Sequence, residues 1–271
     1  MPELPEITCR AREMKKALVG RTVTAIEVLQ PKCLNVPPDE FVTALTGATI
    51  GDVTHHGKWL FVETTKGYFL LNMGMGGEIL LVTRDTLPEK HRLVFDFADG
   101  ASLSINFWWF GYAHYIPSGA LETHAMTAKQ GPNALEVTAE DLKAMLDGRR
   151  GRIKSFLLDQ SKIAGIGNAY IHDILFLARL HPLRPIDTLT EDEVAGLAEA
   201  IDRGLRPSAE AGGAFYEVNL YGKRGGFTAD RLLVGYREGK ACPVCGATIE
   251  KLKTGSTASF VCPQCQPLTP D

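Results

Sequence analysis

The sequence predicts an α+β protein of two domains, a β-rich N-terminal one and a helical C-terminal one that ends in a cysteine hairpin. Residues 22–116 are rich in β-branched and aromatic residues, and turn dipeptides such as Lys66-Gly67 divide them into short strands. Residues 138–204 instead place apolar residues at helical spacing. Four cysteines then follow as two closely spaced pairs. A chain of 271 residues is long enough for this arrangement.

The composition is that of an ordinary soluble globular protein, with 45% hydrophobic and 23% charged residues. No apolar run approaches the length of a membrane span, and the polar N-terminus is not a signal peptide, so we expect a cytoplasmic protein without a membrane partner. The net charge of −3 does not by itself indicate a nucleic-acid-binding protein. Basic residues nevertheless concentrate in residues 148–184 and 221–253, whereas residues 187–202 carry acids and no base. This distribution is compatible with DNA binding on one face.

The first domain, residues 1–120, is expected to be an antiparallel β-sandwich with one helix packed on it. Residues 5–18 place Ile7, Met14 and Leu18 at helical spacing before a glycine ends the pattern. Strand-like segments continue from there to residue 116. Residues 121–137 are weakly patterned, and we interpret them as the linker.

The second domain, residues 138–235, is expected to be helical. The predicted helices cover residues 138–147, 152–160, 168–180 and 190–204. A tight turn with two glycines (SKIAGIG) precedes the third helix, whose start at Asn168 would offer backbone N–H groups to a phosphate. A turn that merely links two packed helices explains the same spacing. Residues 212–227 form a long glycine-rich loop, a candidate flexible cover over a site.

The chain begins MPELPE, and these residues are compatible with a nucleophilic amine at the N-terminus. A small second residue favours removal of Met1, which would leave Pro2 with a free secondary amine. Such an amine titrates near 8, so part of it is neutral at physiological pH, and its attack on a carbon bearing oxygen gives an iminium that acts as an electron sink. Glu3 places an acid beside this nucleophile, and Glu6 lies one turn later. The same residues could simply start a capped helix.

The last segment, residues 236–271, is expected to be a metal-bound hairpin. Cys242, Cys245, Cys262 and Cys265 form a Cys-x2-Cys-x16-Cys-x2-Cys pattern within the spacing range of a four-thiolate zinc site. Two disulfides are the alternative, but two-residue gaps suit one metal and the compartment is expected to be reducing. One structural zinc ion would then fold a hairpin too small to hold itself together.

Taken in order, these segments resemble the formamidopyrimidine-DNA glycosylase and endonuclease VIII family of base-excision-repair enzymes. The resemblance rests on MPELPE, HHGKWL, MGMGG, the pair Gly131-Pro132, LLDQSKIAGIGNAYIHDILFLARLHPLRP and the ending YREGKACPVCG…CPQCQ. It spans nearly the whole chain in the family's order. It implies a helix–two-turn–helix DNA-binding domain, a zinc finger, DNA glycosylase activity and AP lyase activity.

The resemblance also implies roles for single residues. Pro2 would attack C1′ of a damaged nucleotide, Glu3 would assist ring opening, and Lys58 would contact the phosphate backbone at the lesion. Because the target nucleotide must leave the stack, apolar wedges would fill the gap. The implied DNA-binding residues are Met75, His91, Trp108, Phe110, Arg150 and Asn168. Glu6 would cap its own helix.

Three positions depart from the family's pattern. The family usually carries Asp-Pro-Arg-Arg before Phe110, where this chain has Asn106-Phe107-Trp108-Trp109. In the family an arginine of this segment hydrogen-bonds to the orphaned base. The indole of a tryptophan can stack on a base, but it has a single N–H donor and cannot form a pair of hydrogen bonds that identifies the base. The sequence therefore does not predict which base lies opposite the lesion. Thr257 stands where the family's zinc hairpin presents an arginine. Threonine brings no positive charge to the DNA phosphates beside the lesion, and the resemblance implies that the arginine assists a second elimination step, so the sequence does not predict that step. Asn72 replaces a histidine common beside the wedge loop.

The leading hypothesis is therefore a zinc-containing DNA glycosylase and AP lyase that acts on damaged DNA as a monomer, in the cytoplasm at a bacterial nucleoid. If Met1 were retained, the Pro2 nitrogen would be a tertiary amide and could not attack. One alternative is a non-catalytic protein that binds damaged DNA on the same scaffold. Another is an enzyme restricted mainly to abasic sites or unusual lesions.

Overall fold

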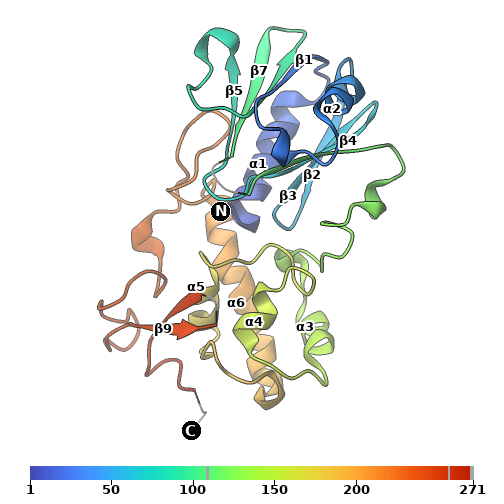
Figure 1. The fold of residues 1–271 in the computed structure, drawn as a ribbon. Helices are drawn as coiled ribbons and strands as arrows, with labels where there is room; N and C mark the ends of the chain where they lie inside the picture. Colours follow the sequence, from blue (N-terminus) through green and yellow to red (C-terminus); the bar gives the residue numbers. More distant parts are fainter. Residues whose placement is uncertain (108–109, 256, 269–271) are drawn as a thin grey trace. The chain divides into compact units, whose positions relative to one another are not determined.

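The structure is a computed structural model that describes residues 1–107, 110–255 and 257–268 (Figure 1). The chain divides into two compact units. The first comprises residues 1–129 together with 212–226, and the second comprises residues 130–211 together with 227–271. Among the described residues, no helix has the length and apolar character needed to cross a lipid bilayer.

The first unit is a β-sandwich of two four-stranded antiparallel sheets. One sheet has the order β1 (Val23–Val28), β6 (Leu93–Phe97), β7 (Ala101–Asn106) and β5 (Glu78–Thr83). The other has the order β2 (Ile50–His56), β3 (Trp59–Thr64), β4 (Gly67–Asn72) and β8 (Tyr112–Ile116). Two α-helices accompany the sheets, α1 (Leu4–Leu18) and α2 (Pro38–Leu45). The predicted sandwich with an N-terminal helix is confirmed.

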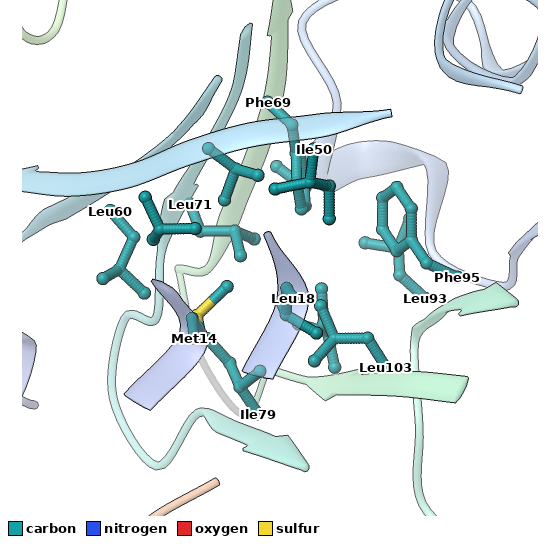
Figure 2. Packing of buried hydrophobic residues seen from close by; sticks show 14 of the residues in the cluster. Met14, Leu18, Ile50, Leu60, Phe69, Leu71, Ile79, Leu93, Phe95 and Leu103 are labelled. Atoms are coloured by element: carbon teal, nitrogen blue, oxygen red, sulfur yellow. The ribbon is translucent and has the colours of Figure 1, made fainter. Parts of the chain in front are cut away.

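Helix α1 and the inner faces of the two sheets enclose the core of this unit (Figure 2). Met14 and Leu18 of α1 are fully buried, and they point toward apolar side chains of both sheets (Figure 2). The labelled partners are Ile50, Leu60, Phe69, Leu71, Ile79, Leu93, Phe95 and Leu103. Burial of this surface stabilises the sandwich at roughly 25 cal/mol per Å² of apolar area removed from water. The same packing fixes the N-terminal end of α1, which carries Glu3.

Helix α2 is an element that the sequence analysis missed, because residues 22–116 were interpreted as strands throughout. It is short, with Pro38 in its first turn followed by Asp39 and Glu40, which suit the positive end of a helix. Phe41 and Leu45 are its buried residues. Eight residues are too few for a periodic signal to stand out between strands.

In its described residues, the second unit contains four α-helices and a two-stranded hairpin. The helices are α3 (Ala139–Leu146), α4 (Ile153–Leu158), α5 (Ile171–Leu177) and α6 (Glu191–Glu210), and the hairpin strands are β9 (Glu250–Thr254) and β10 (Thr257–Val261). Short 3-10 turns in the two units cover Pro31–Cys33, Arg84–Thr86, Leu121–Thr123, Ala134–Glu136, Ile186–Thr188 and Ala229–Arg231. Helices α3 and α6 begin at capping boxes on Thr138 and Thr190, close to their predicted starts.

Two of the predicted helices in this unit have wrong bounds. Helix α6 continues to Glu210 with Pro207 inside it, whereas the prediction ended at residue 204. Helix α5 starts at Ile171, so Asn168 lies in the preceding turn and not at a helix N-terminus. The turn instead fixes Asn168 through Tyr236, whose hydroxyl donates to the Asn168 carbonyl at 3.3 Å.

Candidate active site

The sequence PELPE builds the N-terminal end of α1. Glu3 is the N-cap residue with extended backbone, and its N–H donates to Oε2 of Glu6 at 2.9 Å. Proline in the first helical turn has its φ already set for a helix. Pro2, Glu3 and Glu6 are all buried. Glu6 therefore caps its own helix, as expected, and Glu3 is held immediately after Pro2.

Lys58 lies in the tight turn between β2 and β3 and is half-buried. Burial lowers the pKa of Lys58, and the negative charges of Glu3 and Glu6 oppose this effect. Lys58 therefore lies within electrostatic reach of the helix start. The structure brings Glu3 and Lys58, which the sequence separates by more than fifty positions, to one place in the first unit.

Asn72 connects this lysine to the next loop. Its Nδ2 donates to the Lys58 carbonyl at 3.1 Å, and its Oδ1 accepts from the Gly74 N–H at 3.0 Å. The sequence offered no interpretation of the asparagine at this position. The structure shows that it fixes both the turn of Lys58 and the loop that carries Met75.

Met75 and Phe110 are exposed to solvent, Met75 by 48% and Phe110 by 71%. Phe110 also adopts a φ of 55°, in the left-handed region that is uncommon for an aromatic residue. At the following Gly111, a Cβ would lie 1.9 Å from the Phe107 ring, so only glycine fits there. Met75 and Phe110 are therefore not core residues. Trp108 and Trp109 lie outside the described residues.

The remaining predicted DNA-binding residues lie on several segments. His91 is half-buried before β6, with Nδ1 2.8 Å from the Pro88 carbonyl oxygen. Arg150 is exposed on the segment that joins α3 to α4. Asn168 is half-buried in the glycine turn, and its Nδ2 lies 3.5 Å from the Tyr236 hydroxyl. Arg150 and Asn168 belong to the second unit, and His91 belongs to the first.

Residues 212–226, here called the strap, belong to the first unit although α6 precedes them in the chain. The Ala214 N–H donates to Glu6 Oε1 at 3.1 Å, and the Leu220 N–H donates to Glu13 Oε2 at 2.9 Å. Arg10 of α1 donates to the Val218 carbonyl between these points. The sequence predicts a flexible cover here, but side chains on one face of α1 hydrogen-bond to the backbone of the strap and hold it in place.

The strap carries Glu217, a residue that the sequence analysis missed. Its Oε1 lies 3.8 Å from the N-terminal amine of Met1, and its side chain is only 14% exposed. Burial raises the pKa of Glu217 to about 7, with a further raising effect from Glu6. The positive charge of the N-terminal amine opposes this shift. No pattern in the sequence distinguishes this glutamate from a solvated one.

The four paired cysteines lie together beside the hairpin of β9 and β10. Their sulfur atoms all lie within 4.8 Å of one another, with Cys242 Sγ 3.8 Å from Cys265 Sγ and Cys245 Sγ 3.3 Å from Cys262 Sγ. A disulfide would need about 2.05 Å, whereas a tetrahedral ion with sulfur bonds of about 2.3 Å spaces its ligands by somewhat under 4 Å. The donor set therefore fits a metal ion.

Buried polar side chains attach this hairpin to the helices of the second unit. Lys154 of α4 donates through Nζ to Thr254, Thr257 and Ser259 and to the Ala258 carbonyl, at 2.8–3.0 Å. Asp173 of α5 accepts three backbone N–H bonds from residues 233–235. Thr257, the departure from the family's arginine, is thus a hydrogen-bond partner of Lys154.

A β-sandwich with a buried acid at its first helix, a helical unit and a four-cysteine hairpin make up the architecture of a class of DNA-repair glycosylases, as comparison with known proteins shows. Family models match the formamidopyrimidine-DNA glycosylase N-terminal domain over residues 1–106 and its H2TH domain over residues 130–219. A zinc finger found in FPG and IleRS matches residues 239–268. The chain belongs to the formamidopyrimidine-DNA glycosylase family of base-excision-repair enzymes.

Individual relatives agree with the family models. The formamidopyrimidine-DNA glycosylase of Roseiflexus sp. (strain RS-1) is 36% identical over 98% of this chain and 100% of its own length. That of Pelotomaculum thermopropionicum is also 36% identical, over 98% of this chain and 99% of its own. A solved structure of Lactococcus lactis Fpg with DNA containing an abasic site has a TM-score of 0.90 at 29% identity, covering 98% of this chain and 99% of that one.

Proposed function

We propose that this enzyme excises damaged bases from DNA and then nicks the strand at the abasic site through an iminium on Pro2. The observation that carries the proposal is the placement of Glu3. It is the buried N-cap residue directly after Pro2, its N–H donates to Glu6, and it lies within electrostatic reach of Lys58. Relatives of the same fold have been solved with DNA containing an abasic site, and MutM has been solved in complex with DNA containing carbocyclic 8-oxo-G.

Each catalytic residue has a distinct task in this mechanism. Once Met1 is removed, the neutral Pro2 nitrogen attacks C1′ and the damaged base leaves with the electron pair of its glycosidic bond. Glu3 donates a proton to the ring oxygen as the sugar opens and the iminium forms. The iminium makes the C2′ proton acidic. Glu3, now a carboxylate, takes this proton, and the C2′–H electron pair forms a C=C bond as the C3′–O bond breaks and the 3′ phosphate leaves. Lys58 holds a phosphate beside this centre, where burial strengthens the attraction.

Residues of both units would bind the DNA. Met75 and Phe110 are exposed apolar side chains of the kind that fill the space left by an everted nucleotide. Arg150 and Asn168 of the second unit and His91 of the first would contact the phosphate backbone. From its place in the sequence, two residues before Phe110, we propose that Trp108 stacks on the orphaned base. Stacking is sequence-tolerant, so we propose weak selection for the base opposite the lesion.

The metal is proposed to be one structural zinc ion, because four thiolates at this spacing suit zinc. Zinc supplies folding energy to the hairpin and takes no part in the chemistry. We also propose that the enzyme acts as a monomer on damaged DNA at the bacterial nucleoid. Thr257 stands where the family's hairpin presents an arginine, and its neighbour Lys154 is buried in hydrogen bonds, so we propose that most product retains the 3′ unsaturated aldehyde of a single elimination.

Borohydride trapping tests this proposal. The protein, shown by mass spectrometry to begin at Pro2, is mixed with a duplex that contains an abasic site and then reduced. A covalent adduct is expected from the wild type. The matched control carries one extra residue before Pro2 and leaves every side chain unchanged. It should bind the duplex but give no adduct. Tight binding without an adduct from the wild type would replace the enzyme with a damage-binding protein.

A further inference from the structure

The strap is anchored so that one of its side chains is directed at the N-terminus. Glu6, Arg10 and Glu13 lie on one face of α1 at intervals of four and three residues, and they bind the backbone of the strap at Ala214, Val218 and Leu220. A further bond joins the Leu81 N–H of β5 to the Leu220 carbonyl at 2.9 Å. Glu217 therefore lies in the strap between two residues, Ala214 and Val218, whose backbones are bound to α1, the helix that directly follows Pro2 and Glu3.

The carboxyl group of Glu217 lies next to the position that the reacting amine will take. Its Oε1 is 3.8 Å from the amine of Met1. Only the Cα and carbonyl carbon of Met1 separate that amine from the Pro2 nitrogen, a span of less than about 4 Å. Removal of Met1 moves the amine to Pro2, within that span of the present contact with Glu217.

Formation of an iminium from a secondary amine needs a proton acceptor. Attack of the neutral Pro2 nitrogen forms the N–C1′ bond and breaks the bond from C1′ to the base, whose electron pair leaves with the base. The nitrogen then holds a positive charge and its original N–H proton. That proton must leave before the N–H electron pair can form the C=N bond as the C1′–O4′ bond breaks. Glu3 gives its proton to O4′ in this step, so a second group must accept the one on nitrogen.

We propose that Glu217 is this acceptor, a catalytic base toward the Pro2 nitrogen that complements Glu3 as the acid toward the sugar oxygen. The inference rests on the proposed iminium chemistry and adds a residue to it. Two carboxyl groups of the first unit then divide the proton transfers, one from the helix start and one from the strap.

The charges around Glu217 suit this task. It faces the N-terminal amine, Glu6 and Arg10 of α1, and Glu78 at the start of β5. Burial raises the pKa of Glu217 to about 7, Glu6 and Glu78 add to the rise, and the amine and Arg10 oppose it. A base with a pKa near the working pH and near that of an α-amino group exchanges protons with it at little free-energy cost.

The test is single-turnover borohydride trapping of an abasic-site duplex between pH 5.5 and pH 9, at saturating protein. For the wild type, the rate of adduct formation should rise through pH 7 as Glu217 ionises. Glu217→Gln should slow adduct formation at pH 7 by roughly 10- to 100-fold, in the range of general base catalysis, and should lose the inflection near pH 7. Added formate should restore part of the rate. Binding of a duplex with a stable abasic-site analogue should change less than about twofold.

Two variants separate a base from a merely structural residue. Glu63→Gln removes one negative charge from an exposed position on β3 of the same unit and should leave the rate and the inflection unchanged. Glu13→Gln loosens the strap at Leu220 and should slow the reaction without moving the inflection. If Glu217→Gln traps at the wild-type rate, or slows while keeping the inflection and ignoring formate, Glu217 is not the base. The iminium mechanism survives that result, whereas a wild type that gives no adduct removes both proposals.

Discussion

The carboxylate of Glu6 accepts a hydrogen bond from the Ala214 N–H at 3.1 Å, which joins the first turn of α1 to the strap across 208 positions of sequence. The other oxygen of the same carboxylate accepts from the Glu3 N–H at 2.9 Å. One buried acid therefore holds both the helix start and the strap. Arg10 and Glu13 add further anchors for the strap, but of these three side chains Glu6 is the one that also binds the backbone at the helix start.

Glu6→Gln is expected to weaken both attachments, because an amide offers one acceptor oxygen and turns its NH2 group toward a backbone donor. Loss of buried hydrogen bonds of this kind costs about 1–3 kcal/mol. Amide hydrogen exchange at Glu3 and Ala214 should become faster, while exchange in the core strands should change little. Adduct formation should slow at all pH values. Unchanged exchange at Ala214 would show that the strap is held by other contacts.

Phe110→Ala is expected to weaken DNA binding without affecting stability. The side chain is 71% exposed, so its removal should change the free energy of unfolding by less than about 0.5 kcal/mol. Contact of an aromatic ring with a base is worth roughly 1–3 kcal/mol, which corresponds to about 5- to 150-fold in affinity. Titration of an abasic-site duplex followed by fluorescence anisotropy measures the effect.

The matched control for Phe110 is Leu29→Ala, another exposed apolar side chain of the first unit at 51% exposure. It should leave affinity unchanged. Equal losses from both variants would mean that exposed apolar surface in general, and not a wedge at Phe110, contributes to binding.

Removal of the metal is expected to unfold the hairpin of β9 and β10. A two-stranded hairpin is marginal in water, and the apolar cluster beneath it includes the buried ligands Cys242 and Cys262 themselves. A chelator or Cys245→Ser should therefore expose the hairpin to protease and release one zinc ion per chain. DNA affinity should fall, while the β-sandwich keeps its circular dichroism. Two disulfides in a non-reducing mass spectrum would contradict the metal site.

Lys154 of α4 supports the hairpin separately from the metal, through its hydrogen bonds to β9 and β10. Lys154→Met removes the donor to four oxygen acceptors, and it should increase hydrogen exchange in β9 and β10 while leaving the zinc content at one ion per chain. Hairpin loosening without metal loss would separate the two supports. Loss of zinc from this variant would show that Lys154 is needed to assemble the ligands.

Local signals in the sequence were sufficient for much of the fold. The stripe of Ile7, Met14 and Leu18 predicted α1, and it is buried as expected. The two cysteine pairs predicted a cluster that the structure brings together. The turn of Lys66-Gly67 follows from a φ of 119° at Gly67, where an added Cβ would meet the Ile116 carbonyl at 2.5 Å. Each of these features depends on neighbours in sequence or on a fixed spacing.

The parts that could not be predicted depend on contacts between distant segments. The strap has the composition of a mobile loop, and only the long-range bonds from Glu6, Arg10 and Glu13 give it a fixed path. Glu217 carries no mark in the sequence, because burial against α1 is what alters its chemistry. The chemistry of MPELPE indicated Pro2 as a nucleophile and Glu3 as an acid, whereas their target at C1′ and the role of Lys58 came only from the resemblance to the family.

The buried histidine pair of the first unit should make its stability sensitive to acid. His114 Nδ1 lies 2.8 Å from His124 Nε2, and both rings pack against Trp59. Burial lowers the pKa of His114 to about 4, with a further contribution from His124, and burial also lowers the pKa of His124. Because the folded pKa lies below the value of about 6.5 in the unfolded chain, the unfolded chain binds the proton first. The stability is complete above pH 6.5 and is lost as the pH falls toward 4, by about 3 kcal/mol for His114 alone.

His114→Gln should flatten this dependence, because the amide does not titrate in this range. The free energy of unfolding of the first unit, measured by urea denaturation at intervals between pH 7 and pH 4, should lose a slope of about one proton in the variant. Thr127→Val is the comparison: it removes the hydroxyl 2.8 Å from His124 Nδ1 but leaves both rings, so it should lower stability at every pH and keep the slope. A wild-type stability that stays level down to pH 4 would mean that the pair accepts a proton without breaking. His114 would then be protonated inside the folded sandwich, and the contact with His124 would rearrange in place of unfolding the unit.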